Sequence, residues 1–287
     1  SVRLKDKLHE FFSDLPNVSW KKPKFQPIIS VVNPYKYKKK SLLLMLSDSM
    51  NTIWKLDFLD LIEQYLVLLG LRKDPHNIFE ELEALFKKFG NKPLYFFLFA
   101  KNTFYDTGVS IYNFSYRKLI KDIADLNTVS LLGSYASQNE PKALLEECSQ
   151  LKKLILNKLN SVRFNYGLLS ASSGYFILLE QEIHMDYSMG YKEEVGYRAS
   201  TAVPFYFYDL NNDIQTPLKI HPIVAEEQGL RKFSTQKAFK KLEELYENLP
   251  TRSAFHGVSF SNAIFNASEM KNSWRYQFIN YLRYHAQ

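Results

Sequence analysis

Charged side chains that could perform acid–base chemistry follow several short apolar runs of the sequence. Asp48 follows an early run, and Arg163, Asp186, Arg198 and His256 lie near later ones. A carboxylate, an imidazole and guanidinium groups that converge on one face would form a credible catalytic site. Asp48 and His256 could then transfer protons without a metal, beside one of the two arginines. The alternative is a buried network of ion pairs that only holds the fold together.

Ser134 and several tyrosines form a second set of candidates. Ser134 and Tyr135 follow an apolar run, and Tyr187 and Tyr197 lie in a segment rich in Gly, Tyr and Ser. These residues could bind a substrate, because tyrosine rings stack on sugar rings; packing in the core or at its rim is the alternative. Ser134 has no Gly-x-Ser-x-Gly context, which argues against a serine hydrolase. The sequence also has no glycine-rich phosphate loop.

The elements that must position these residues form a repeating pattern from residue 41 onward. The predicted strands are Leu42–Ser47, Leu94–Ala100, Val129–Tyr135, Asn165–Leu169, Phe205–Tyr208, Leu218–Val224 and Ala254–Phe260. The predicted helices between them are Leu56–Leu69, Ile78–Phe89, Tyr116–Leu126, Lys142–Leu159, Ser173–Glu182, Thr235–Asn248 and Met270–Tyr284. This alternation predicts an α/β fold, a distorted (β/α) barrel of about seven strands. Active sites of such barrels lie at the C-terminal ends of the strands.

Composition limits the class of protein. The chain has 287 residues, of which 46% are apolar and 15% aromatic, enough to bury a sizeable core. We interpret residues 1–40 as an N-terminal lead-in segment and residues 41–287 as the barrel domain. The longest apolar runs are too short to span a bilayer, so no membrane span is expected. The net charge of +7 comes largely from local lysine runs. Without a nucleic-acid-binding motif, such runs are typical of solvated faces.

The second half of the sequence resembles the polysaccharide deacetylase family, carbohydrate esterase family 4, in a divergent bacterial branch. The resemblance rests on the motifs Asp186-Tyr-Ser-Met-Gly-Tyr191, Gly196-Tyr-Arg-Ala-Ser-Thr201, Pro204-Phe-Tyr-Phe-Tyr-Asp-Leu210 and Phe255-His256-Gly257. It extends over roughly residues 41 to 285, which is more specific than any single motif. It implies a distorted barrel that removes N-acetyl or O-acetyl groups from polysaccharides. The family's zinc ion is held by one Asp and two His, with a second Asp as general base and a His as general acid.

The chain departs from the family at the metal ligands. The resemblance aligns the ligand positions with Met50, Leu132 and Asn165, none of which is a good zinc ligand. It keeps the base as Asp48 and the acid as His256, and it also keeps Arg163 and Arg198. A catalytic zinc needs three protein ligands, so we expect no metal cofactor here.

These observations leave several functions open. The favoured interpretation is a pseudoenzyme that binds a carbohydrate or a protein partner. The alternative is a divergent, active deacetylase or esterase, for which an apolar, filled pocket around Met50 and Leu132 would be unfavourable. A third interpretation is a module that binds anionic polymers, which predicts that the lysine runs gather on one face. Nucleic acid is not an expected partner, and the cellular compartment stays open.

Overall fold

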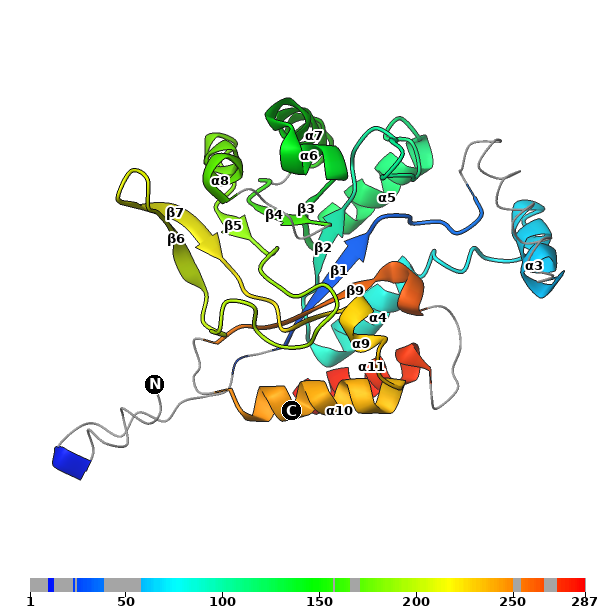
Figure 1. Ribbon diagram of the computed structural model, residues 1–287. Helices are drawn as coiled ribbons and strands as arrows, with labels where there is room; N and C mark the ends of the chain where they lie inside the picture. Colours follow the sequence, from blue (N-terminus) through cyan, green and yellow to red (C-terminus); the bar gives the residue numbers. More distant parts are fainter. Residues whose placement is uncertain are drawn as a thin grey trace.

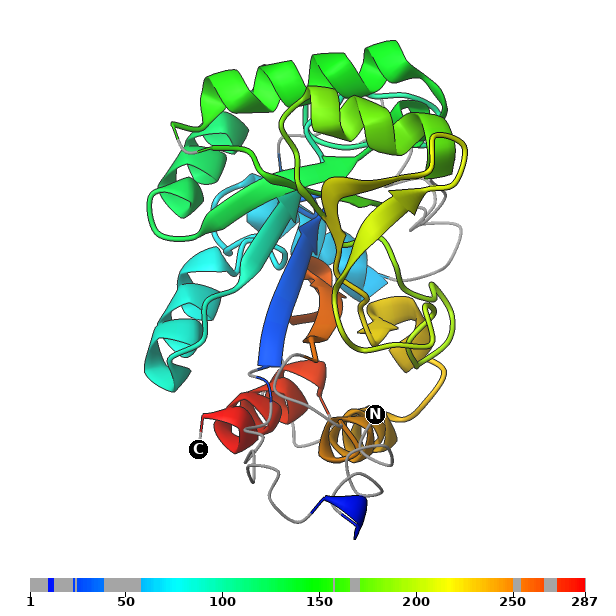
Figure 2. The same cartoon turned by 90° about the vertical axis from the view of Figure 1, so that its left-hand side faces the viewer.

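The computed structural model of this chain describes residues 10–12, 23, 25–38, 58–156, 158–165, 171–249, 254–265 and 273–286 (Figures 1 and 2). Asp48 and Met50, and the predicted strand Leu42–Ser47, lie outside these residues.

A curled sheet forms the centre of the fold. In the described residues it has nine strands, in the order β6-β7-β5-β4-β3-β2-β1-β9-β8. The strands are β1 (Phe25–Val31), β2 (Leu94–Phe97), β3 (Thr128–Gly133), β4 (Ser161–Phe164), β5 (Met185–Asp186), β6 (Phe205–Asp209), β7 (Ile214–Ile220), β8 (Ala225–Glu226) and β9 (His256–Ser261). All neighbours pair in parallel except β6 and β7, which are antiparallel. The predicted α/β fold with a distorted, barrel-like sheet is confirmed.

Helices accompany the sheet, and several of them pack on its outer face. They are α3 (Phe58–Leu68), α4 (Phe79–Phe89), α5 (Phe114–Ala124), α6 (Tyr135–Asn139), α7 (Pro141–Leu154), α8 (Ala171–Glu180), α9 (Glu227–Leu230), α10 (Thr235–Glu247) and α11 (Trp274–His285), with the 3₁₀ helix η1 (Asn262–Phe265). In Figure 1, α5 to α8 lie on one side of the molecule, and α10 and α11 lie on the other. None of the helices in the described ranges is long and apolar enough to cross a membrane.

Helix α4 illustrates how the sequence sets these elements. Glu80 and Glu81 lie in its first turn and Lys87 and Lys88 in its last, which matches the helix dipole. Gly90 follows with a left-handed φ of 69°, and its N–H caps the last carbonyl groups. The apolar side chains between these ends pack against the sheet.

Two apolar clusters lie on the two faces of the sheet. The larger one fills the space between the sheet and the helices. The smaller one contains Ile28, Phe96, Leu132, Tyr187 and Ile223, which come from different strands and from the segment after β7. These residues alternate along their strands with residues of the outer cluster, so they fill the inside of the curl.

Strand β1 was missed by the sequence pattern, which placed residues 25–31 in the lead-in segment. The strand pairs with β2 on one side and with β9 on the other. Pro27 lowers the strand propensity of this run, because proline cannot donate a backbone hydrogen bond. Burial of Ile28, Ile29 and Val31 on both faces outweighs that cost.

Other strands differ in position from the prediction. Strand β4 occupies Ser161–Phe164, whereas the predicted strand began at Asn165. Arg163 therefore lies within the strand. Strands β5 and β8 have two residues each, too short for any periodicity to reveal.

Lys152 and Lys153 lie on α7, whereas Lys240 and Lys241 lie on α10 at the opposite side of the molecule, so these two lysine runs do not share a face (Figure 1).

Candidate functional site at the mouth of the curled sheet

A cavity of about 400 Å³ opens where β1, β4, β8 and β9 end. Ser30, Arg163, Asn165, Glu226 and Ser259 are among its lining residues. We call it the mouth cavity. Its volume is within the usual range of ligand pockets, roughly 300–1,000 Å³. It also lies at the C-terminal edge of parallel strands, where barrels of this kind place their sites.

Arg163 is the central polar residue of the mouth cavity. Its side chain is only 3% exposed, and its Nη2 atom lies 2.7 Å from Oε2 of Glu226. Its Nε donates a hydrogen bond of 3.3 Å to Oγ of Ser30, which in turn lies 3.1 Å from Oγ of Ser259. Buried charges are tolerated when they are paired and hydrogen-bonded, and these contacts supply both.

The contact between Arg163 and Glu226 also shows that the sheet is strongly curved. Four strands lie between β4 and β8 in the sheet order. In a flat sheet such strands would be roughly 24 Å apart, since neighbours are about 4.8 Å apart. Contact between Arg163 and Glu226 requires the sheet to bend back on itself.

The rim of the mouth cavity is charged. Arg231 donates from Nε to Oε1 of Glu227 at 2.7 Å, and the other carboxylate oxygen of Glu227 accepts from N and Oγ of Ser261. Lys192 lines the same cavity from the segment that follows β5. Asn165 adds an uncharged amide next to Arg163.

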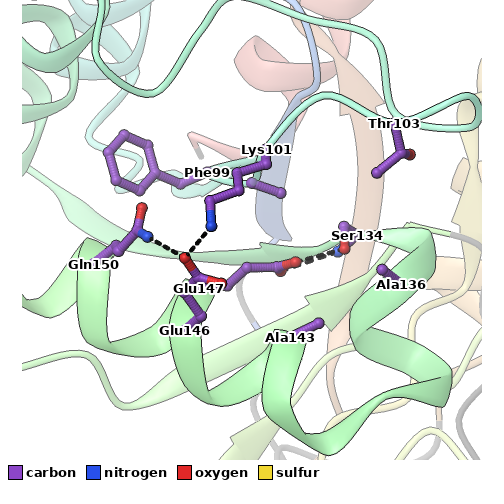
Figure 3. A pocket seen from close by; sticks show the side chains of 10 residues that line it. Phe99, Lys101, Thr103, Ser134, Ala136, Ala143, Glu146, Glu147 and Gln150 are labelled. Carbon is purple, nitrogen blue, oxygen red and sulfur yellow. Dashed lines mark hydrogen bonds and ion pairs between the residues drawn. The ribbon is translucent and has the colours of Figure 1, made fainter.

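A second cavity, of about 190 Å³, lies between the segment after β2 and helices α6 and α7 (Figure 3). Ser134 caps α6 and donates from Oγ to Oε1 of Glu147 at 2.5 Å. Burial raises the pKa of Glu147 to about 7. Lys101 pairs with Glu146 at the open side. The predicted substrate residue Ser134 thus lies in this cavity, not in the mouth cavity.

Tyr135 lies beside the second cavity. Its ring stacks on that of Tyr105, with 4.0 Å between ring centroids. Its backbone N–H donates to the buried carboxylate of Asp106 at 2.7 Å. The Tyr105 side chain is 56% exposed, so this stacked pair reaches the surface.

Asp186 is fully buried at the end of β5. Its Oδ1 accepts hydrogen bonds from Oγ and N of Ser188, at 2.5 and 3.2 Å. Burial raises the pKa of Asp186 to about 6, against the opposing effect of these hydrogen bonds. Ser188 also accepts from the backbone N–H of Phe164, so Asp186 helps to join β4 to the segment after β5.

Two of the tyrosines predicted to bind a substrate, Tyr187 and Tyr197, are engaged in packing. Tyr187 belongs to the inner apolar cluster and stacks on His221 at 4.6 Å. Tyr197 donates from its hydroxyl to the carbonyl of Phe255 at 3.0 Å. The neighbouring Arg198 is exposed and is not among the residues that line the mouth cavity.

His256 lies at the other end of the sheet from Arg163. It is the first residue of β9 and pairs in register with Phe25, the first residue of β1. Its Nε2 lies 2.5 Å from the hydroxyl oxygen of Tyr281 on α11. Burial in this aromatic environment lowers the pKa of His256 to about 3, which keeps the ring neutral near pH 7. The sequence had suggested that Arg163, Arg198, Asp186 and His256 converge on one face. The structure places Asp186 within electrostatic reach of Arg163 but His256 at the opposite end of the sheet, so the four do not form one site.

Solved structures identify the fold. A protein of Mycobacterium smegmatis, assigned as a polysaccharide deacetylase, is similar with a TM-score of 0.52 and 10% sequence identity, over 94% of this chain and 86% of that one. A protein of Pseudomonas aeruginosa PAO1 with the same assignment has a TM-score of 0.52 and 12% identity, over 90% and 84% of the two chains. The chain has the polysaccharide deacetylase fold.

Other comparisons add little to this assignment. A pseudoenzyme of carbohydrate esterase family 4 from Bacillus anthracis has a TM-score of 0.45 and 8% identity, over 95% of this chain and 66% of that one. This similarity is too low to support an argument. No family model and no curated protein sequence matches the chain.

The described residues do not fit the zinc ion that the polysaccharide deacetylase fold implies. Leu132, which the family resemblance aligns with a ligand position, is fully buried among Ile28, Phe96 and Tyr187. It pairs in register with Arg163, whose positive charge would repel a nearby cation. In the part of the chain that the structure describes, no group of three or more His, Cys, Asp or Glu side chains could hold a metal ion.

Sequence reasoning missed most residues of the mouth cavity, among them Glu226, Ser30 and Ser259. Glu226, the partner of Arg163, ends a strand of two residues and has no local signal. Ser30 and Ser259 lie within strands whose other residues are mainly apolar. Polar residues at alternate positions of a buried strand indicate a polar layer inside a barrel. The alternation of Ser259 and Ser261 could therefore have predicted that both serines face the inside of the sheet.

Proposed function

We propose that this chain is a glycan-binding protein with the polysaccharide deacetylase fold that has lost the zinc-dependent hydrolysis of that family. The observation that carries the proposal is that Leu132 lies in the apolar cluster inside the curl. The family resemblance aligns this residue with a zinc-ligand position. A buried leucine can supply no metal ligand, and loss of one ligand weakens a three-ligand site.

The binding part of the proposal rests on the two cavities. The mouth cavity combines charged side chains with the amides of Asn165 and Gln228. Such groups are suited to sugar hydroxyls, which both donate and accept hydrogen bonds. The stacked rings of Tyr105 and Tyr135 offer an aromatic surface beside the second cavity. Sugar rings pack well on aromatic faces of this kind.

A direct test is calorimetric titration of zinc, and then cobalt, into chelator-treated protein. The proposal expects no tight binding of either metal and no release of acetate from acetylated chito-oligosaccharides. It expects a thermal shift or calorimetric signal with one or more members of a panel of bacterial oligosaccharides. One-to-one zinc binding with acetate release would instead establish a divergent deacetylase. Binding of a protein partner with no glycan binding would also overturn the proposal.

A further inference from the structure

We propose that the mouth cavity binds a sugar that carries one carboxylate, such as a hexuronic acid residue of an acidic glycan. This inference rests on the proposed glycan-binding function and names the ligand class of the same site. It follows from the number of Arg163 donors that have a hydrogen-bond partner and from the charge of the residues that line the cavity.

Arg163 lines the cavity and has one donor atom without a partner. Its Nε and Nη2 are engaged by Ser30 and Glu226. Its Nη1 is buried and has no hydrogen-bond partner among the described residues. Leaving a buried charged donor unsatisfied is costly, and a carboxylate is the acceptor that a guanidinium group binds best. A ligand carboxylate at Nη1 would complete the set of contacts.

The charge of the mouth cavity fits a ligand with one negative charge. Of the described residues that line it, Arg163, Lys192 and Arg231 are cationic, and Glu226 and Glu227 are anionic. Asp186 does not line the cavity, although its buried carboxylate interacts electrostatically with Arg163. Among the described lining residues alone, one positive charge is left in excess. A monoanionic carboxylate balances it, whereas a phosphate group with close to two charges would add repulsion from Glu226 and Glu227.

The remaining lining groups favour a sugar over a simple organic acid. Asn165 and Gln228 place amide groups at the same cavity. An amide both donates and accepts hydrogen bonds, which matches the hydroxyls of a sugar ring. The volume of about 400 Å³ leaves room for a ring in addition to its carboxylate.

The experiment compares trigalacturonic acid with its fully methyl-esterified form by isothermal titration calorimetry. The two probes have the same ring and linkages and differ in charge. We expect the acid to bind at least about tenfold more tightly. We also expect added salt to weaken its binding, because charges attract less when screened. Glucose 6-phosphate, acetate and the neutral ester are each expected to bind more weakly than the acid.

Two variants test the residues. The double substitution Arg163→Gln with Glu226→Gln removes both charges and keeps hydrogen-bonding groups, and it should abolish the preference for the acid. Lys192→Gln, at the exposed rim, should weaken binding of the acid severalfold without changing the fold. Lys232→Gln is the matched control, because Lys232 is an exposed lysine paired with Glu193 and Glu194 and does not line the cavity. It should leave binding unchanged.

Three results would overturn the inference: equal binding of acid and ester, tighter binding of the sugar phosphate, or no binding of the acid at millimolar concentrations. If the ester or another neutral glycan binds at least as tightly as the acid while zinc does not bind, the inference fails and the proposed function stands. Zinc binding with acetate release removes the proposed function itself.

Discussion

The guanidinium group of Arg163 on β4 pairs with the carboxylate of Glu226 on β8 at 2.7 Å, across the inside of the curl. Replacing Glu226 by Ala would leave Arg163 buried without a counter-ion. We expect this change to lower the free energy of unfolding by about 3 kcal/mol. Urea denaturation followed by circular dichroism measures the loss.

The control for Glu226→Ala is Glu194→Ala. Glu194 pairs with Lys232, and both side chains are largely exposed, so we expect a change within about 0.5 kcal/mol. Equal losses in the two variants would show that the Arg163–Glu226 pair contributes no more than a surface pair.

Leu132→His introduces a potential metal ligand at a position that the family resemblance aligns with a zinc ligand. The imidazole would enter an apolar cluster with Ile28, Phe96 and Tyr187. We expect a loss of about 2 kcal/mol in the free energy of unfolding and no tight zinc binding, since one ligand does not make a site. Leu132→Met is the control, with an expected cost below about 1.5 kcal/mol. Zinc that stabilises the histidine variant would contradict this expectation.

His256 should make the fold sensitive to acid. Its pKa in the folded protein is lowered to about 3, against an ordinary value of about 6.5. Between these values the unfolded chain binds a proton that the folded chain does not. The stability contributed by the neutral ring is therefore fully present above about pH 6.5 and decreases as the pH falls toward 3. Tyr246, Tyr281 and His285 surround the ring, and burial lowers the pKa of His285 to about 4, in the same direction.

Comparison of wild type with His256→Gln isolates this contribution. The stability difference between the two proteins should shift by about 2 kcal/mol, against wild type, between about pH 7 and pH 5. Urea denaturation at each pH provides the measurement. Parallel pH profiles would show that another group determines the acid sensitivity.

Glu147 should act in the opposite direction. Burial raises its pKa to about 7, above an ordinary value near 4.5, so the folded chain holds its proton more tightly than the unfolded chain. Its stabilising contribution is fully present below about pH 4.5 and is lost as the pH rises through 7. Glu147→Gln cannot ionise, so it should gain about 2 kcal/mol relative to wild type between about pH 5 and pH 8.

Thermal unfolding across that pH range checks the prediction for Glu147. Gln150→Ala is the matched control, because Gln150 lines the same cavity without a titratable group (Figure 3). It should shift the whole profile without changing its slope. A Glu147→Gln profile with the slope of wild type would refute the raised pKa as the cause.

Much of the fold could be predicted because long amphipathic helices and buried strands leave strong periodic signals. Helix α4 was predicted to within one residue, at Ile78–Phe89 against Phe79–Phe89. Strand β1 was not, because Pro27 interrupts its pattern and its stability depends on pairing with two strands that lie far from it in the sequence. Strand pairing is a tertiary contact that local propensity does not contain.

The candidate site was predicted only in part. Arg163 was found from its place beside an apolar run, and Leu132 and Asn165 from the family resemblance. His256 was placed in the site because it lies close to a strand, but it is at the strand's first residue instead of its last. Glu226 was missed, since its partnership with Arg163 depends on the curl that brings β8 opposite β4. A short window of the sequence carries no information about a contact between two strands that are so far apart in the chain.

The pairing of β1 with β9 has a consequence for biosynthesis. Ser30 and Ser259 contact each other across 229 positions of the chain. A ribosome therefore releases β1 long before the strand that covers its edge has been made. Contacts so distant in sequence raise the contact order and slow folding. Until β9 arrives, β1 presents an uncovered strand edge of the kind that associates with other chains, and a chaperone that shields this edge would raise the yield of folded protein.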